Sequence, residues 1–293
     1  MTTTRYALLI GLLLLITIPV HAQDVEAPPE GWNTGLIGKA ALAQVGFQNW
    51  NEGGVNSLSV STGLDGSAKK TSGRLEQVHE LRLAYGLIKQ GDEELRKAED
   101  LISIKGSWLY QGEDFFARFK PTFGATLRTQ FYEGLNFDTN PFDDDDREPP
   151  VKVSDFFAPA TLTQALGLTY QPAPWITQTL GVAAKETVVT IERLRTLYAV
   201  DADKSIRFEV GVEAVTNVDK QLMENINYKS SLRLFAAYNQ TGAPDVLWEN
   251  LIAMKVNEWI SVNFELTTLY DADITKQLQL KEVLTVGLSY ILF

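Results

Sequence analysis

The chain has 293 residues, with 26 Lys and Arg against 37 Asp and Glu, two histidines and no cysteine. The acidic balance disfavours nucleic-acid binding, because that function needs clustered Lys and Arg to neutralise phosphates. The absence of cysteine excludes disulfides, thiol nucleophiles and zinc–thiolate sites.

The N-terminal segment predicts export. Arg5 precedes an apolar run of 14 residues, Ala7 to Val20, and Val-His-Ala at 20–22 suits a cleavage site. A membrane-spanning helix needs about 20 apolar residues, so this run is too short. We expect residues 1–22 to be a signal peptide, residues 23–31 a short periplasmic tail, and the mature chain to carry a formal charge of −12.

Segments that alternate between apolar and polar residues follow one another from residue 34 to the end of the chain. In the last of them, Leu284, Val286 and Leu288 alternate with small or polar residues. The pattern predicts twelve strands, each as long as a tilted membrane strand of about 9–11 residues. Their expected ranges are 34–47, 55–65, 75–88, 101–111, 115–134, 157–171, 175–188, 205–216, 226–239, 246–256, 259–270 and 278–293.

A soluble β-sandwich would show the same alternation, so the polar face of the strands matters. Charged residues recur there, as they do in the wet lumen of a membrane barrel. The residues that we expect to line such a lumen are Lys105, Arg207, Glu209, Glu213 and Glu265. The outer face of a sandwich would also accept them.

The tryptophans lie near the ends of the expected strands. Aromatic belts occupy this position at the two interfaces of a membrane. The residues expected at the interfaces are Trp32, Trp50, Trp108, Trp175, Trp248 and Trp259.

Connection lengths alternate along the chain, as in outer-membrane barrels with long outside loops and short periplasmic turns. The stretch 217–225 is an exception, and 186–205 mixes strand and helix signals. The expected outside loops are 48–54, 89–100, 135–156, 189–204, 240–245 and 271–277.

These features predict an all-β fold, one closed antiparallel transmembrane barrel of about twelve strands over residues 32–293, in a Gram-negative outer membrane. We expect the last strand to pair with the first, because closure leaves no unpaired edge in lipid. The terminal Phe293 resembles the aromatic C-terminal signal of outer-membrane proteins, although it is out of phase with Leu284, Leu288 and Leu292.

Several stretches resemble an uncharacterised family of bacterial outer-membrane barrels, known as a domain of unknown function. They are FQNWNEGGVNSLSVS (47–61), FKPTFGATLRTQFYEGLNF (119–137), DFFAPATLTQALGLTY (155–170) and KETVV (185–189). The resemblance implies a barrel and its location. It implies no catalytic or ligand-binding residue.

Two features are candidates for chemistry. The acidic run Asp143, Asp144, Asp145 and Asp146 offers oxygen ligands to Ca²⁺ or Mg²⁺, but four consecutive acids cannot converge on one ion. The sole histidine after the signal segment, His79, shares the parity of the expected lipid-facing residues. Without a catalytic motif, we expect neither an enzyme nor a cofactor.

The expected function is a narrow pore or small-solute passage, because twelve strands fall between filled eight-stranded barrels and open sixteen-stranded channels. A non-conducting structural or adhesive barrel acting through its outside loops is the main alternative. A lipid hydrolase using His79 and a soluble exported sandwich are further alternatives. The expected partners are outer-membrane lipid and small solutes or divalent cations, and no nucleic acid.

Overall fold

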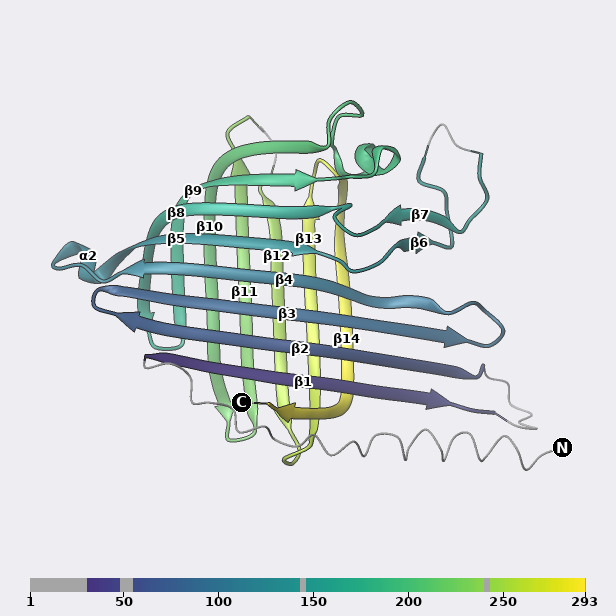
Figure 1. The fold of residues 1–293 in the computed structure, drawn as a ribbon, viewed down its shortest axis with the longest axis horizontal. Helices are drawn as coiled ribbons and strands as arrows, with labels where there is room; N and C mark the ends of the chain where they lie inside the picture. The colour runs from purple at the N-terminus through teal and green to yellow at the C-terminus, as the bar shows by residue number, and fades with distance from the viewer. Residues whose placement is uncertain (1–30, 48–54, 143–145, 240–242, 293) are drawn as a thin grey trace.

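The computed structural model describes residues 31–47, 55–142, 146–239 and 243–292. In this part of the chain, twelve strands form a closed antiparallel barrel in which each strand pairs with its neighbours along the chain (Figure 1). The strands are β1 (Trp32–Val45), β2 (Ser57–Ser72), β3 (Leu75–Gln90), β4 (Arg96–Tyr110), β5 (Phe119–Thr129), β8 (Ala160–Ala173), β9 (Ile176–Val188), β10 (Ile206–Met223), β11 (Ile226–Ala237), β12 (Asp245–Lys255), β13 (Ile260–Asp271) and β14 (Thr275–Ile291). The predicted twelve-stranded closed barrel is therefore confirmed.

Side chains alternate between the outer face and the lumen along every strand, and β14 shows the pattern clearly. Leu284, Val286 and Leu288 are 52–65% exposed on the outer face. Their neighbours Thr285 and Gly287 pair with Asn263 and Ser261 of β13 and face the lumen. Leu166 and Leu180 on β8 and β9 are equally exposed. The outer face of the barrel is thus apolar, and the lumen is polar.

Some predicted limits are wrong. Strand β2 continues to Ser72, although 65 was the predicted end, and β4 begins at Arg96, although 101 was the predicted start. The predicted strand 115–134 is wrong as well. It contains a short helix α2 (Phe115–Arg118), then β5, and then the start of β6 (Gly134–Asn136). Strand β5 ends because the carboxylate of Asp100 accepts hydrogen bonds from the backbone N–H groups of Phe131 and Tyr132, at 2.7 and 3.0 Å. These bonds turn the chain away from the barrel ladder.

The sequence predicts a long connection at 217–225, where the alternation of loop lengths requires a short turn. The structure has a short turn there. Strand β10 runs to Met223, so only Glu224 and Asn225 separate it from β11. At the end of the barrel where β10 connects to β11, every connection between described strands is short or contains only α2. We call this end the turn end. The opposite end, which carries the longer connections, is the loop end.

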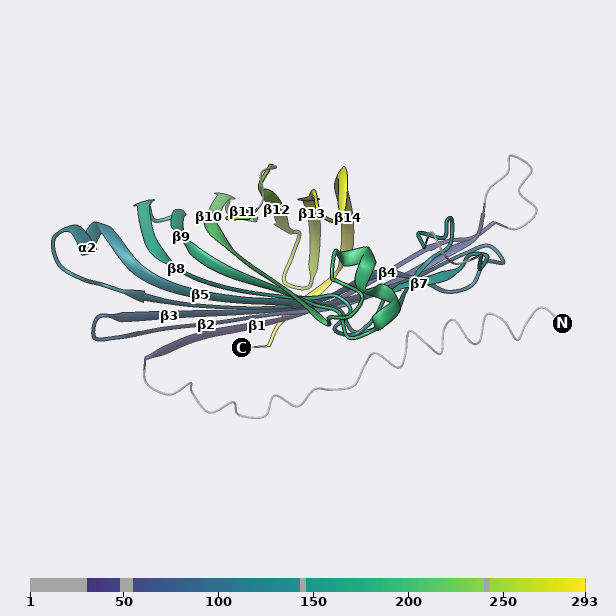
Figure 2. The same cartoon turned by 90° about the horizontal axis from the view of Figure 1, so that it is seen from above.

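Two long connections form an ordered unit at the loop end. We call the described parts of 130–159 and 189–205 the loop platform; it contains the small sheet of β6 and β7 (Val151–Ser154) and the helix η1 (Glu192–Tyr198). It lies at the end of the barrel opposite to α2 in both Figure 1 and Figure 2. Among the described residues, no helix is long and apolar enough to cross a membrane.

The loop platform has its own apolar core. The buried residues of this core are Phe142, Val151, Ala158, Val189, Leu194 and Val200. In the described part of the chain, the largest side chains that are fully buried are Leu194, Val189 and Val200. The most completely buried apolar side chains thus lie outside the barrel, whose apolar residues mostly face outward.

Two paired glycines allow a close approach between β8 and β9. Gly167 pairs with Gly181, and a Cβ on Gly181 would lie 2.4 Å from the carbonyl oxygen of Leu166. Backbone atoms cannot move aside as a flexible side chain can. Glycine is therefore required at this point of the wall.

Candidate functional site

A group of ion pairs crosses the middle of the lumen. Glu249 of β12 accepts a hydrogen bond from Nη1 of Arg128 on β5 at 2.7 Å, and its other oxygen lies 3.5 Å from Nζ of Lys105 on β4. In the ring of twelve strands, β4 and β12 lie six places apart. Side chains from opposite walls therefore meet, and they obstruct the lumen at this level.

Two further ion pairs extend this obstruction. Arg82 of β3 pairs with Glu265 of β13. Arg233 of β11 pairs with Glu213 of β10 and donates a hydrogen bond to Oγ1 of Thr126 on β5 at 3.1 Å. We call the charged members of these contacts the ion-pair layer: Arg82, Lys105, Arg128, Arg233, Glu213, Glu249 and Glu265. Four cations and three acids make the layer nearly balanced in charge.

A second charged group lies in the lumen at the loop end. Lys185 lies within 3.5 Å of carboxylate oxygens of Glu209, Asp245 and Asp271. Arg207 contacts Glu209 at 3.3 Å, Asp271 at 3.6 Å and Asp273 at 2.6 Å. We call these six residues the mouth cluster. Its four acids outnumber its two cations, so this end of the lumen carries a negative potential.

The residues that the sequence places in the lumen are distributed over both groups. Lys105, Glu213 and Glu265 belong to the ion-pair layer, and Arg207 and Glu209 belong to the mouth cluster. The other members were not predicted from the sequence; they are Arg82, Arg128, Lys185, Arg233, Asp245, Glu249, Asp271 and Asp273. Several of them are single charges between apolar neighbours, such as Arg82 between Leu81 and Leu83. This signal was available in the sequence.

The tryptophans lie at strand ends. At the turn end, the ring of His79 packs between Trp32 and Trp108, with centroid distances of 5.8 and 5.3 Å. Trp259 stacks on Tyr290 at 5.3 Å.

The remaining tryptophans divide between the two ends. The Lys220 ammonium lies 4.6 Å from the ring centroid of Trp175 in the turn after β8. Near the loop end, Nε1 of Trp248 donates a hydrogen bond to Oγ of Ser230 at 3.0 Å. Trp50 lies outside the described residues, and the interfacial role of all six stays a prediction.

The acidic run is only partly within the described chain. Asp143, Asp144 and Asp145 lie outside the described residues, and Asp146 is exposed. Within the described ranges, no group of three His, Asp or Glu side chains is arranged to hold a metal ion. A divalent-cation site therefore stays an expectation from the sequence.

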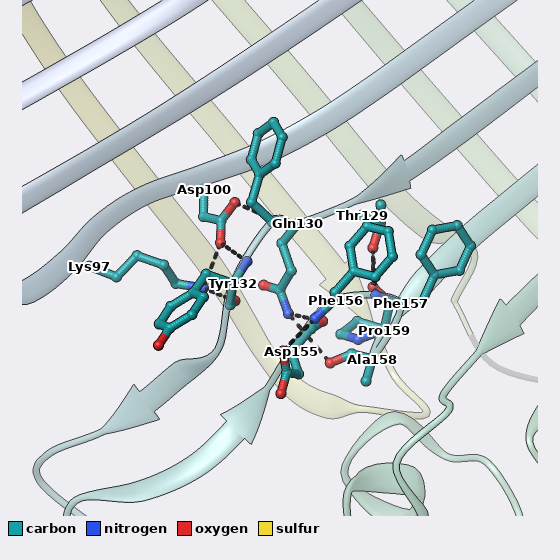
Figure 3. Close-up of polar contacts among 11 residues, drawn as sticks. Lys97, Asp100, Thr129, Gln130, Tyr132, Asp155, Phe156, Phe157, Ala158 and Pro159 are labelled. Atoms are coloured by element: carbon teal, nitrogen blue, oxygen red, sulfur yellow. Dashed lines mark hydrogen bonds and ion pairs between the residues drawn. The ribbon is translucent and has the colours of Figure 1, made fainter.

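Hydrogen bonds attach the loop platform to the barrel. Nε2 of Gln130 donates to the backbone carbonyls of Asp155 at 2.8 Å and Ala158 at 3.4 Å (Figure 3). Oγ1 of Thr129, the last residue of β5, donates to the carbonyl of Pro159 at 3.1 Å. These bonds hold the start of β8 against the end of β5, so the platform has a fixed attachment.

Charged groups reinforce the platform. Nζ of Lys152 lies 2.8 Å from carboxylate oxygens of both Glu133 and Asp155. The hydrogen bond from Lys152 lowers the pKa of Asp155, and its two carboxylate partners raise the pKa of Lys152. Burial raises the pKa of Tyr198 to about 12, and its hydroxyl donates to the carbonyl of Val153 at 2.8 Å.

Comparison with solved structures gives similarities at low sequence identity. The translocator domain of the autotransporter NalP from Neisseria meningitidis is 9% identical, with 97% of this chain and 95% of that chain covered and a TM-score of 0.40. The COG4313 outer membrane channel from Pseudomonas putida F1 is 11% identical, with 92% and 97% covered and a TM-score of 0.36. OmpF from Salmonella typhi, in complex with daunomycin, is 10% identical, with 89% and 96% covered and a TM-score of 0.27.

The comparison with protein families agrees with the resemblance seen in the sequence. No curated protein matches the chain. Residues 42–135, about a third of the chain, match the model of the family described as "Protein of unknown function (DUF3078)". The predicted resemblance to an uncharacterised family of barrel proteins is thus confirmed: residues 42–135 match a family of unknown function, and the chain that contains them is a closed twelve-stranded β-barrel.

Proposed function

We propose that the protein is an outer-membrane barrel of a Gram-negative bacterium whose lumen is a narrow passage for small polar solutes, closed at rest by the ion-pair layer. The observation that supports this most is the contact of Glu249 with Lys105 and Arg128 across the lumen. A barrel that served only as a scaffold could fill this space with apolar side chains, because replacing ion pairs by packed apolar residues is often neutral or stabilising. Charged side chains in the lumen therefore favour a role that involves polar solutes.

The location in a membrane is supported by the outer face. Leucines and valines on β8, β9, β10 and β14 are more than a third exposed in the isolated chain. An apolar surface of this extent is stable when hydrocarbon covers it, and a closed barrel satisfies its backbone hydrogen bonds internally. The loop end then faces outward from the cell, and the turn end faces the periplasm.

The ion-pair layer is suited to reversible closure. The side chains of Lys105, Arg128 and Glu249 retain 32%, 35% and 20% of their exposure, so water reaches them. Ion pairs in contact with water contribute about 0–1 kcal/mol, so separating the partners costs little, whereas removing one partner of a buried pair costs about 3–5 kcal/mol. A polar solute can therefore replace one partner with its own hydrogen bonds. The negative mouth cluster favours the entry of neutral or cationic solutes over anions.

Planar-bilayer recording of the purified, refolded chain tests the proposal. We expect small stepwise currents from the wild-type chain and larger steps when the layer is weakened by Glu249→Ala. If neither protein conducts and both are folded, the passage is ruled out.

A second candidate is a non-conducting barrel that presents its loop platform to a partner outside the cell. The buried core around Val189, Leu194 and Val200 favours it, because it makes the platform a fixed surface, and binding residues lie disproportionately on loops that a rigid scaffold positions. Lack of current in both proteins of the bilayer experiment, with an intact platform, would favour this alternative.

A further inference from the structure

Two lysines at the turn end lie over tryptophan rings on the outer face of the barrel. Nζ of Lys70 lies 5.5 Å from the ring centroid of Trp32, the residue opposite it on β1. Nζ of Lys220 on β10 lies 4.6 Å from the ring centroid of Trp175. Both lysines share the parity of the exposed apolar residues on their strands, such as Val60 on β2. The outer face at this end therefore carries cations that are attracted to the faces of aromatic rings.

Arg118 makes a third contact of this type, between β5 and β8. Its guanidinium carbon lies 5.8 Å from the ring centroid of Phe119 and 5.4 Å from that of Tyr170. Nη2 of Arg118 lies 3.4 Å from the hydroxyl oxygen of Tyr170. The two rings belong to partners in the β5–β8 ladder, and their centroids are 5.4 Å apart. We call Lys70, Arg118 and Lys220, with the rings that they contact, the cation–aromatic pairs.

These three cations differ from most others in the chain because they have no acidic partner. In the described part of the chain, no carboxylate forms an ion pair with Lys70, Arg118 or Lys220, whereas Lys152 and Lys185 each contact more than one. The chain has 37 acids for 26 Lys and Arg, so the lack of acidic partners does not follow from a shortage of acids. The three cations are therefore available to an anion from outside the chain.

The outward-facing acids lie at the other end of the barrel. Among the described strand residues, the acids with outward parity are Asp100, Glu186 and Glu282, and each lies in the half of its strand nearer the loop end. At the turn end, the acids lie in the turns, as Glu113 does, or face the lumen; Glu113 pairs with Arg74. The outward-facing charges on the strands at the turn end are thus cationic.

We propose that the cation–aromatic pairs bind the phosphodiester headgroups of anionic phospholipids in the leaflet that surrounds the turn end. This inference rests on the membrane location proposed above and is independent of conduction. Aromatic rings and lysine stems suit the boundary between hydrocarbon and headgroups, and the cations match the charge of the phosphate. A zwitterionic headgroup brings its own ammonium to the same place, so the sites favour a lipid with a net negative charge.

Photo-crosslinking in vesicles tests the sites with phosphatidylglycerol as the anionic probe and phosphatidylcholine as its zwitterionic counterpart. Each probe carries a diazirine at the head end of one acyl chain and is present at the same low fraction in unlabelled phosphatidylcholine. The attraction of one Lys or Arg to an anionic lipid corresponds to about a fivefold preference, so we expect phosphatidylglycerol to label Trp32, Tyr170 and Trp175 about five times as strongly. Equal labelling by the two probes would overturn the proposal.

A single substitution separates three built sites from a general surface potential. Lys220→Gln should abolish the preference for phosphatidylglycerol at Trp175 and leave it unchanged at Trp32, because the two residues belong to different pairs. Equal loss of the preference at both positions would assign the effect to the overall charge of the outer face and would refute specific sites.

A triple variant with a matched control extends this comparison. The preference should be lost at all three positions when Lys70, Arg118 and Lys220 are changed together to Gln. The control changes three exposed cations at the loop end to Gln, namely Lys89, Lys204 and Lys276, and removes the same charge. The control should retain the preference, and equal loss in the two triple variants would contradict the proposal.

Two further measurements distinguish the source of the phosphate and the reason for a failure. An excess of inorganic phosphate should not reduce labelling, and competition by it would show a site for a free ion. Flotation of the chain with the vesicles reports insertion separately. A folded chain that does not float overturns the membrane location and this inference with it. An inserted chain without a preference for phosphatidylglycerol overturns this inference alone.

Discussion

Lys105 and Glu249 lie on strands six places apart in the ring of twelve, and yet their side chains approach to 3.5 Å. This contact joins opposite walls through the lumen. It shows that the cross-section at this level is limited by side chains, because two extended side chains are enough to span it. The lumen of this barrel is therefore obstructed in its middle and polar on both sides of the obstruction.

Glu249→Ala should both widen the proposed passage and change its charge. The substitution leaves Lys105 and Arg128 without the acid that they share, so two cations then face the obstructed part of the lumen. We expect a larger conductance and a shift toward anions, measured as a change in reversal potential in a KCl gradient. Glu148→Ala, which removes an exposed acid in the loop platform, is the control and should leave both quantities unchanged. Identical traces for wild type and Glu249→Ala would contradict this role.

Gly181→Ala should impair folding of the barrel. The new methyl group would lie 2.4 Å from the Leu166 carbonyl oxygen and 2.7 Å from Gly167 Cα, and neither backbone atom can move without breaking the β8–β9 ladder. Gly124→Ala is the matched control, because a Cβ there meets nothing within 4 Å. The measurement is the fraction of refolded chain that keeps the faster gel mobility of a folded barrel without heating. Equal folded fractions for the two variants would show that the wall accommodates the methyl group.

The sequence predicts the barrel well because alternation is a local property of each strand. Leu284, Val286 and Leu288 indicate the face that they occupy without reference to any other strand. The end of β5 was mislocated because Asp100, about 30 residues earlier, provides the bonds that turn the chain at Phe131. Partners across the lumen, such as Glu249 and Lys105, depend on the register of many strands. Parity alone therefore identifies lumen residues but not their ion pairs.

Tyr198→Phe should loosen the loop platform and leave the barrel intact. The substitution removes the hydroxyl that donates to the Val153 carbonyl, a hydrogen bond worth about 1 kcal/mol. Hydrogen exchange should accelerate in 151–154 and 192–198 and stay unchanged in β8 and β9. In the wild type, the raised pKa of Tyr198 means that its neutral form stabilises the platform. That contribution is complete below the ordinary tyrosine pKa of about 10 and is lost as the pH rises through about 12.

Acid should loosen the same platform through Asp155. Its pKa is lowered by the hydrogen bond from Lys152, so its ionised form stabilises the folded platform. The contribution is complete above the ordinary aspartate pKa of about 3.9 and is lost as the pH falls through the lowered value. Because the pair is in contact with solvent, screening limits the effect to about 0.2–1 kcal/mol.

Hydrogen exchange of residues 151–158 between pH 6 and pH 2.5, corrected for the intrinsic pH dependence of exchange, measures this contribution. Asp155→Asn should lose most of the acid sensitivity, because the amide has no proton to gain in this range. Asp201→Asn is the control: Asp201 forms a comparable ion pair with Lys204, but both side chains are mostly exposed and lie outside this segment. Acid sensitivity that persists in Asp155→Asn and disappears in Asp201→Asn would assign the effect to the Asp201–Lys204 pair and contradict the prediction. The opposite result would connect the stability of the loop platform to one carboxylate beside Lys152.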